Sequence, residues 1–161
     1  MNSRTAVPLA LALLIVACAA SSASAWSNDP TQNNLITDAT GPQGNPSIVH
    51  VGEGHSYVIW EDRAGGGARA YGQRLDGEGD PVWAPGGIAM SDTASYQSAA
   101  RALAGPEFNC YVLWMDARTG HWRVMAQLVD SAGFFHWDPD GVPVCADTTG
   151  QANYQVVSDG A

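Results

Sequence analysis

Two aspartates, Asp62 and Asp116, each close an apolar stretch of the sequence, and each has an arginine close by. Arg63 directly follows Asp62, and Arg118 lies two positions after Asp116. A carboxylate beside a guanidinium can contact a ligand, or it can brace a turn through a charge-assisted hydrogen bond. Because the arrangement recurs at matched places in the chain, we expect it to brace a turn in both.

Few residues have the spacing that a metal ion needs. Residues 76–80, Asp-Gly-Glu-Gly-Asp, carry carboxylates at alternate positions, as calcium loops do, but the matched residues 130–134 lack two of the three. Residues 138–141, Asp-Pro-Asp-Gly, are equally short of ligands. No zinc-ligand spacing relates the histidines to one another or to the cysteines; they are His50, His55, His121 and His136. We therefore expect solvated turns in these places, and neither a metal nor another cofactor.

The matched places belong to an internal repeat of 54 residues. When residues 57–92 are set beside 111–146 without a gap, twelve positions are identical. Chance would give about two, at about 6 % identity per position for average composition. The same interval separates Gln43, Gln97 and Gln151, so a third copy begins at the last of these. The predicted organisation is a linker or partial unit over 26–42, unit one over 43–96, unit two over 97–150 and the start of a truncated third unit over 151–161.

We interpret the recurring positions as a structural framework. Large side chains at fixed places in a repeat are typical of residues that pack between stacked sheets. The framework comprises Trp60, Asp62, Arg69, Gln73, Asp76 and Trp83 in the first unit and Trp114, Asp116, Arg118, Arg123, Gln127, Asp130 and Trp137 in the second.

Short strands must position these residues. Apolar or alternating stretches bounded by turn residues predict four strands in each unit. No stretch shows an apolar period of 3.6 residues, so we expect almost no helix beyond an N-terminal leader. Four short strands in a unit of this length predict an all-β fold of tandem four-stranded antiparallel blades of a β-propeller, here about two blades and so incomplete. The predicted strands cover 46–51, 55–61, 68–75 and either Trp83 or 88–90, and then 100–104, 109–115, 122–129 and 137–145.

The second unit contains a series of spaced motifs: Trp114-x-Asp116-x-Arg118-x-Gly120, followed by Met125-Ala126-Gln127-Leu128-x-Asp130-x-x-Gly133-x-x-x-Trp137 and Gly141-Val142-Pro143-Val144-Cys145. This pattern resembles a repeat of large secreted bacterial proteins that look like sialidase-type or other propellers. It implies that this chain is a fragment of a longer propeller. The first unit departs from the pattern, because Arg63 directly follows Asp62 and Gly65-Gly66-Gly67 comes next.

A sialidase-like member of such a group would bind a carboxylate through an arginine cluster, and Arg69 and Arg123 are the candidates that this resemblance implies. Its catalysis would also need a tyrosine nucleophile with an acidic partner. No such set stands out in the sequence. We therefore assign no catalytic residue and keep a fragment of a sialidase-like glycoside hydrolase as the alternative function.

The N-terminus has the pattern of a secretory signal peptide over residues 1–25. Arg4 precedes an apolar run, and small residues ending in Ala-Ser-Ala place the cleavage before Trp26. A competing interpretation is a lipoprotein signal, because the residues up to Cys18 resemble a lipobox, whose cysteine carries the lipid anchor. Either signal predicts an exported protein, periplasmic, secreted or on the bacterial cell surface, without a membrane span.

After residue 25 the chain has six arginines, no lysine and sixteen carboxylates, a net charge of −10. Such a surface gives phosphate backbones little to bind, so we expect no nucleic-acid partner. Cys110 and Cys145 could form a disulfide in an oxidising compartment. Neither has a counterpart in the other unit, which favours two separate thiols.

These observations predict a non-catalytic exported repeat module that binds protein or glycan as part of a larger surface or secreted propeller. Aromatic residues near turns that differ between the units are candidates for a contact patch; they are Trp122, Phe134, Phe135 and His136. Their other interpretation is packing in the core or between blades. An open blade edge also makes self-association an expectation.

Overall fold

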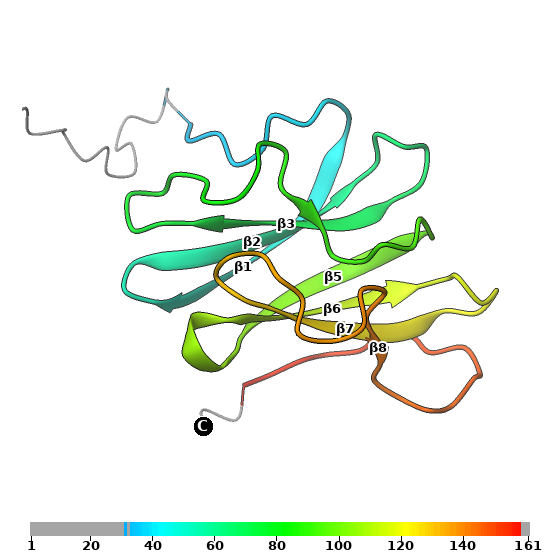
Figure 1. Ribbon diagram of the computed structural model, residues 1–161. Coiled ribbons are helices and arrows are strands. Elements are labelled where there is room, and N and C mark those ends of the chain that lie inside the picture. Colours follow the sequence, from blue (N-terminus) through cyan, green and yellow to red (C-terminus); the bar gives the residue numbers. More distant parts are fainter. Residues whose placement is uncertain (1–30, 32, 159–161) are drawn as a thin grey trace, which may run out of the picture.

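The computed structural model describes residue 31 and residues 33–158 and contains two four-stranded antiparallel sheets that stack on each other (Figure 1). The all-β prediction is confirmed. One 3₁₀ turn, η1 (Pro106–Phe108), is the only helical element in this part of the chain. The predicted signal peptide, its lipobox Cys18 and the first residues of the 26–42 linker lie outside the described residues.

Both sheets have the same strand order. The first sheet runs β1-β2-β3-β4 and the second β5-β6-β7-β8, each strand pairing with the next along the chain. The first sheet is built from β1 (Gln43–Gly52), β2 (His55–Asp62), β3 (Arg69–Leu75) and β4 (Ile88–Ala89). The second is built from β5 (Gln97–Ala104), β6 (Cys110–Asp116), β7 (Arg123–Val129) and β8 (Val142–Pro143).

The strand pairing repeats at the interval of the sequence repeat. Asp62 pairs with Arg69 where β2 meets β3, and Asp116 pairs with Arg123 where β6 meets β7. The paired residues at the other end of these strands are also matched, Ser56 with Leu75 and Cys110 with Val129. One repeat unit therefore folds as one sheet.

The first strand of each sheet begins earlier than predicted. It starts at Gln43 rather than residue 46, and at Gln97 rather than residue 100. An irregularity in pairing follows each glutamine, and within it Asn45 and Ala99 have left-handed backbones with φ of 51° and 52°. Such a bulge adds an unpaired residue and breaks the alternation on which strand prediction depends. The fourth strands are also shorter than predicted, with two residues each.

The hydrophobic core lies between the sheets. The first sheet contributes the side chains on one of its faces, and the second sheet contributes the face turned toward them, so the molecule has one shared core rather than one for each sheet. It consists of Tyr57, Ile59, Ala70, Trp83 and Met90 from the first unit and Ala100, Cys110, Val112, Trp114, Met125 and Val129 from the second.

Each framework tryptophan of the second strand lies against a glycine. A Cβ atom on Gly87 would come within 2.6 Å of the Trp60 ring, and one on Gly141 within 2.5 Å of the Trp114 ring. Both glycines also have positive φ, 78° and 76°, which side chains disfavour. The identity of both pairs in the repeat therefore has a steric cause.

Within the described residues, no helix is long and apolar enough to cross a membrane.

Candidate functional site

The glutamine that opens each unit reaches back to the sheet before it. The side-chain Oε1 of Gln97 accepts a hydrogen bond of 2.9 Å from the backbone N–H of Ala70 on β3. The backbone N–H of Gln97 donates to the carbonyl of Ala68. Gln151 repeats both bonds on the second sheet, with Val124 and Trp122 as partners at 2.8 Å. We call this pair of bonds the glutamine joint. It links successive units through backbone groups.

Asp116 is the centre of a buried hydrogen-bond network. Arg118 donates to it from both its backbone N–H and its guanidinium, the latter at 2.7 Å, and Trp114 and Gln97 donate to its Oδ2. Burial opposes ionisation of the carboxyl, but the donors from Arg118, Trp114 and Ser95 outweigh it, so the pKa of Asp116 is lowered to about 2. The brace expected for Asp116 and Arg118 is present.

The first unit does not repeat this brace. The guanidinium of Arg63 pairs at 2.9 Å with Glu61 and not with Asp62, whose Oδ1 instead accepts from the backbone N–H of Ala64. The expectation of an Asp62–Arg63 pair is therefore wrong. The residue that matches Arg118 is Ala64, so Arg63 lies one position too early. In an extended chain a shift of one residue turns the side chain to the opposite face.

Arg69 and Arg123, the candidates for a carboxylate-binding cluster, each bond a backbone carbonyl. Arg69 donates to the carbonyl of Ser91 at 2.8 Å, and Arg123 donates to the carbonyl of Cys145 at 3.1 Å. Each guanidinium thus ties the third strand of its sheet to the chain that follows the fourth strand.

Gln73 and Gln127 hold the long loop between the third and fourth strands. Each side-chain oxygen accepts from the backbone N–H of the framework tryptophan in that loop, Trp83 at 2.8 Å and Trp137 at 3.2 Å. Each side-chain amide donates to a loop carbonyl. These two residues are structural in both units.

Asp76 and Asp130 close turns. The Oδ1 of Asp76 accepts from the backbone N–H groups of Glu78 and Asp80, and Asp130 accepts from the two matched N–H groups. A carboxylate oxygen used in this way stabilises the turn directly. In the part of the chain that the structure describes, no group of three His, Cys, Asp or Glu side chains is arranged to hold a metal ion.

Both described cysteines are free thiols. Cys110 is buried in the core, and burial raises the pKa of its thiol to about 12. Cys145 is exposed and lies two residues after β8.

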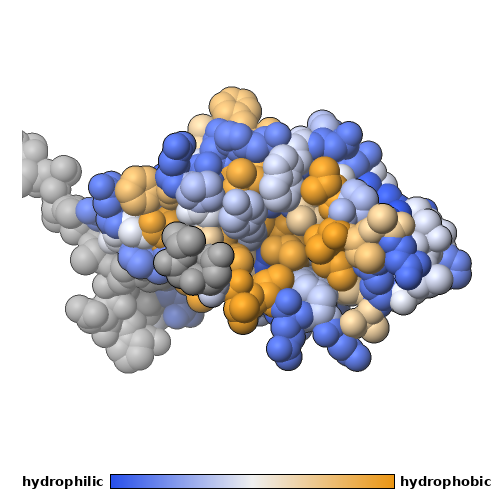
Figure 2. All heavy atoms as spheres, turned by 90° about the horizontal axis from the view of Figure 1, so that it is seen from below, coloured by the Kyte–Doolittle hydropathy of each residue, from blue (hydrophilic) through white to orange (hydrophobic). Residues whose placement is uncertain are grey.

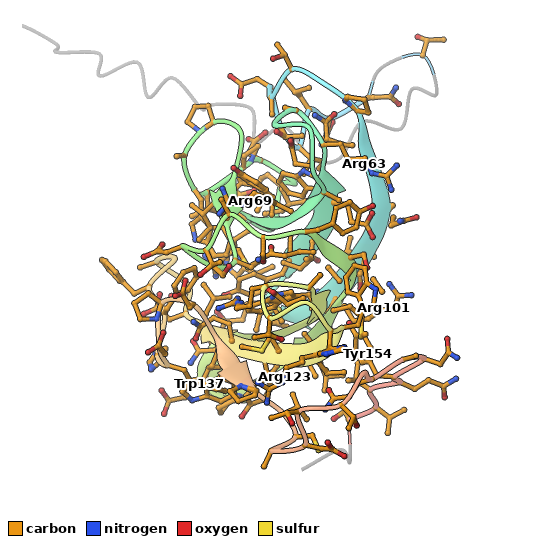
Figure 3. All side chains as sticks on the ribbon, turned by 90° about the vertical axis from the view of Figure 1, so that its right-hand side faces the viewer. Arg63, Arg69, Arg101, Arg123, Trp137 and Tyr154 are labelled. Atoms are coloured by element: carbon orange, nitrogen blue, oxygen red, sulfur yellow. The ribbon has the colours of Figure 1, made fainter. Side chains whose placement is uncertain are left out.

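A groove opens where the first strands of the two sheets lie side by side. It has a volume of about 650 Å³ and contains side chains from both units. Figure 3 shows Arg63 and Arg101 along this side of the molecule, with Arg69 toward the opposite side. We call it the aromatic–arginine groove; its lining consists of Asn45, Pro46, Ser47, Glu61, Arg63, Tyr96, Ser98, Ala99, Arg101 and Trp122.

Two aromatic rings form one wall of the aromatic–arginine groove. Tyr96 and Trp122 pack edge to face, with ring centroids 5.6 Å apart. They remain 50 % and 37 % exposed, so both rings are accessible from solvent. Arg101 is exposed beside them, and one N–H of its guanidinium donates to the carbonyl of Ala100.

Glu61 forms the buried floor of the groove. Its carboxylate accepts from the backbone N–H of Ala99 at 2.8 Å and from Arg63 at 2.9 Å. Burial raises the pKa of this carboxyl, but hydrogen bonds from Asn45, Arg63 and Ala99 outweigh that effect, so the pKa of Glu61 lies below its usual value. Glu61 therefore joins the two sheets as an anion beneath the exposed arginines.

A second hollow of about 710 Å³ continues from this groove. It shares Arg101 and Trp122 with the first and is closed on its far side by residues 151–157. The two hollows have the same place relative to successive units.

Only one of the candidate contact aromatics lies in the groove. Trp122 does, whereas Phe134 and His136 stand in the loop after β7 and Phe135 packs against the core. The sequence did not single out Tyr96, Arg101 or Glu61. A signal was present, because all three differ from the residues 54 positions away, which are Pro42, Ser47 and Met115.

No protein-family model, no curated protein and no solved structure matches this chain.

Proposed function

We propose that this chain is a non-catalytic binding module of an exported β-propeller protein, and that it binds a glycan in the aromatic–arginine groove. The observation that carries the proposal is the exposed Tyr96–Trp122 pair beside Arg101, in a groove lined by residues that differ between the units. The residues common to both units are engaged in hydrogen bonds and packing within the scaffold. The differing residues are the ones left for a ligand.

The propeller assignment is supported by the way the units join. Each unit is a four-stranded antiparallel sheet. The glutamine joint bonds each sheet to the first residue of the next unit. Propellers stack sheets of this kind around an axis. In such an arrangement the first strands are innermost, so the aromatic–arginine groove would open near the axis.

A glycan fits the groove better than a peptide segment does. Aromatic rings pack against the C–H faces of sugar rings, while the arginines and the polar side chains Ser47 and Ser98 can bond hydroxyl groups. A concave site with a few polar groups at an apolar wall is the usual form of a small-ligand site.

The experiment is a glycan-array screen of the purified protein, followed by calorimetry with the sugar that binds. The Trp122→Ala variant should weaken binding at least about tenfold, as loss of a buried aromatic contact does. Phe134→Ala removes a more exposed aromatic that lies outside the groove, and it should leave affinity unchanged. Absence of any glycan ligand, or equal binding by Trp122→Ala, would overturn the proposal; a peptide ligand that depends on Trp122 would replace it with a protein-binding function.

The same samples distinguish a binding module from the alternative, a fragment of a glycoside hydrolase. A hydrolase would shorten the bound glycan over time, which mass spectrometry detects, whereas a binding module returns it intact. In the structure the hydroxyls of Tyr57 and Tyr154 donate to the backbone carbonyls of Phe108 and Leu113.

A further inference from the structure

The outer face of the second sheet exposes apolar side chains whose counterparts in the first sheet are buried. Val144 is 57 % exposed, whereas Met90, its match in the first unit, is 0 % exposed. Leu113 and Tyr111 are partly exposed, and their matches Ile59 and Tyr57 are fully buried. The cause is that the second sheet covers this face of the first, whereas no further sheet among the described residues covers the same face of the second. Figure 2, seen from below Figure 1, shows apolar side chains gathered on this side of the molecule.

The opposite end of the molecule shows the complementary pattern. Ile48 on β1 is 63 % exposed and Val58 is partly exposed, on the face of the first sheet turned away from the second. Their matches on the second sheet, Ala102 and Val112, pack in the core. The two open faces are thus the two halves of the sheet–sheet interface that already exists within the chain.

Residues 151–157 occupy part of the open face of the second sheet. Gln151 makes the glutamine joint there, and the hydroxyl of Tyr154 donates to the carbonyls of Ala99 and Leu113. Asn153 has the same left-handed backbone as Asn45 and Ala99, with φ of 54°. Residues 151–157 therefore take the place on the second sheet that the first strand of a following unit would take. They leave Val144 exposed.

We propose that the first sheet of a second copy of this chain docks on this face, with its residues 43–49 taking the place of residues 151–157. A second copy is the occupant because the exposed face of its first sheet matches the face by which the second sheet packs on the first within one chain. Gln43 already donates to Asp62, as Gln97 donates to Asp116, so its side chain is placed to accept from Val124 of another copy. The contact is head to tail, and such contacts build rings or open chains of copies.

The proposal does not depend on the glycan. The docking face adjoins the groove at Trp122, but Ile48 and Val144, which its test changes, are not among the groove's lining residues. Its readout is molecular mass rather than ligand binding, so failure of one proposal can be distinguished from failure of the other.

The test is sedimentation velocity of the purified protein over a concentration series. The wild-type protein should associate as its concentration rises. Val144→Arg and Ile48→Arg each place a charge on one of the two faces and should each raise the dissociation constant at least about tenfold, since burying an unpaired charge is costly. Both side chains are already exposed, so folding is retained, which circular dichroism checks. Phe134→Arg, outside both faces, should associate like the wild type.

A mixture of the two variants is the decisive sample. Val144→Arg retains an intact first-sheet face and Ile48→Arg retains an intact second-sheet face, so an equal mixture should form one-to-one dimers and nothing larger. A second variant, Tyr154→Ala, weakens the hold of the chain's own segment and should tighten association a few-fold. A wild-type protein that stays monomeric, or a mixture that forms no dimer, would overturn the proposal.

Discussion

The side-chain oxygen of Gln97 accepts a 2.9 Å hydrogen bond from the backbone N–H of Ala70, and both groups are buried where the two sheets meet. A glutamine that opens one unit thus satisfies a backbone donor on the third strand of the unit before it. The amide end of the same side chain donates to Ser91 and Asp116. One side chain therefore connects three segments of the chain.

Replacement of Gln97 by alanine should lower the free energy of unfolding by about 1 to 3 kcal/mol, because it leaves the buried N–H of Ala70 without an acceptor. Gln43→Ala is the matched control. Its side chain is exposed, so its loss should cost less than about 1 kcal/mol. Urea unfolding of the three proteins measures both values, and equal losses would show that the glutamine joint adds nothing beyond its local contacts.

Gly87→Ala should destabilise the chain by about 2 kcal/mol or more. The new Cβ would meet the Trp60 ring and the carbonyl of Gly72, and the positive φ adds strain. Gly65→Ala is the control, because nothing lies within 4 Å of a Cβ there and it should change stability by no more than about 0.5 kcal/mol. Thermal unfolding followed by tryptophan fluorescence is the measurement.

Because of the carboxylate of Asp116, the free energy of unfolding should fall as the pH is lowered. Its pKa is lowered to about 2 in the folded chain from a usual 3.8, so its contribution is present above about pH 4 and is lost as the pH falls toward 2. The size expected from this shift is about 2 kcal/mol. Asp116→Asn should therefore be less stable than the wild type at neutral pH, and the gap between the two should narrow below pH 4. A gap that is constant with pH would contradict this assignment.

Glu61→Met introduces the residue that stands at the matched place in the second unit. It removes the acceptor for Ala99 and the partner of Arg63, and it should lower stability by about 1 kcal/mol or more. Glu61→Gln keeps an acceptor for the Ala99 N–H and should lose less. If Glu61→Met is as stable as the wild type, Glu61 has no part in holding the sheets together.

The two described thiols should differ in reactivity. Iodoacetamide at neutral pH should modify Cys145, which is exposed, and should reach Cys110 only after urea unfolds the chain. Peptide mapping by mass spectrometry identifies the modified residue. A disulfide between Cys110 and Cys145, which would protect both from the reagent until reduction, is the result that this expectation excludes.

The sequence predicted the sheets well because each depends on local signals. Turn residues and alternating apolar residues predicted the second and third strands almost to the residue, and the repeat register predicted that both sheets would pair alike. The start of each first strand was missed because a left-handed residue, Asn45 or Ala99, interrupts the alternation. The fourth strands, of two residues each, are too short to show a pattern.

The groove could not be predicted, because its residues come from different units. Glu61 and Arg101 are 40 positions apart in the sequence and meet only because the second sheet stacks on the first. Identity between units selects residues that build every sheet. Difference between units is the signal that Tyr96 and Arg101 carry, and with one unit pair it does not separate ligand contacts from neutral change.

The glutamine joint also bears on how such a gene changes length. Each unit begins with a glutamine whose side-chain oxygen can accept a hydrogen bond from the unit before it. Its third strand carries the backbone N–H that donates to the glutamine of the unit after it. An in-frame duplication or loss of one whole unit consequently leaves every remaining joint complete, wherever in the unit the recombination falls. A chain with one unit more or one unit fewer would therefore keep the same hydrogen bonds between neighbouring units.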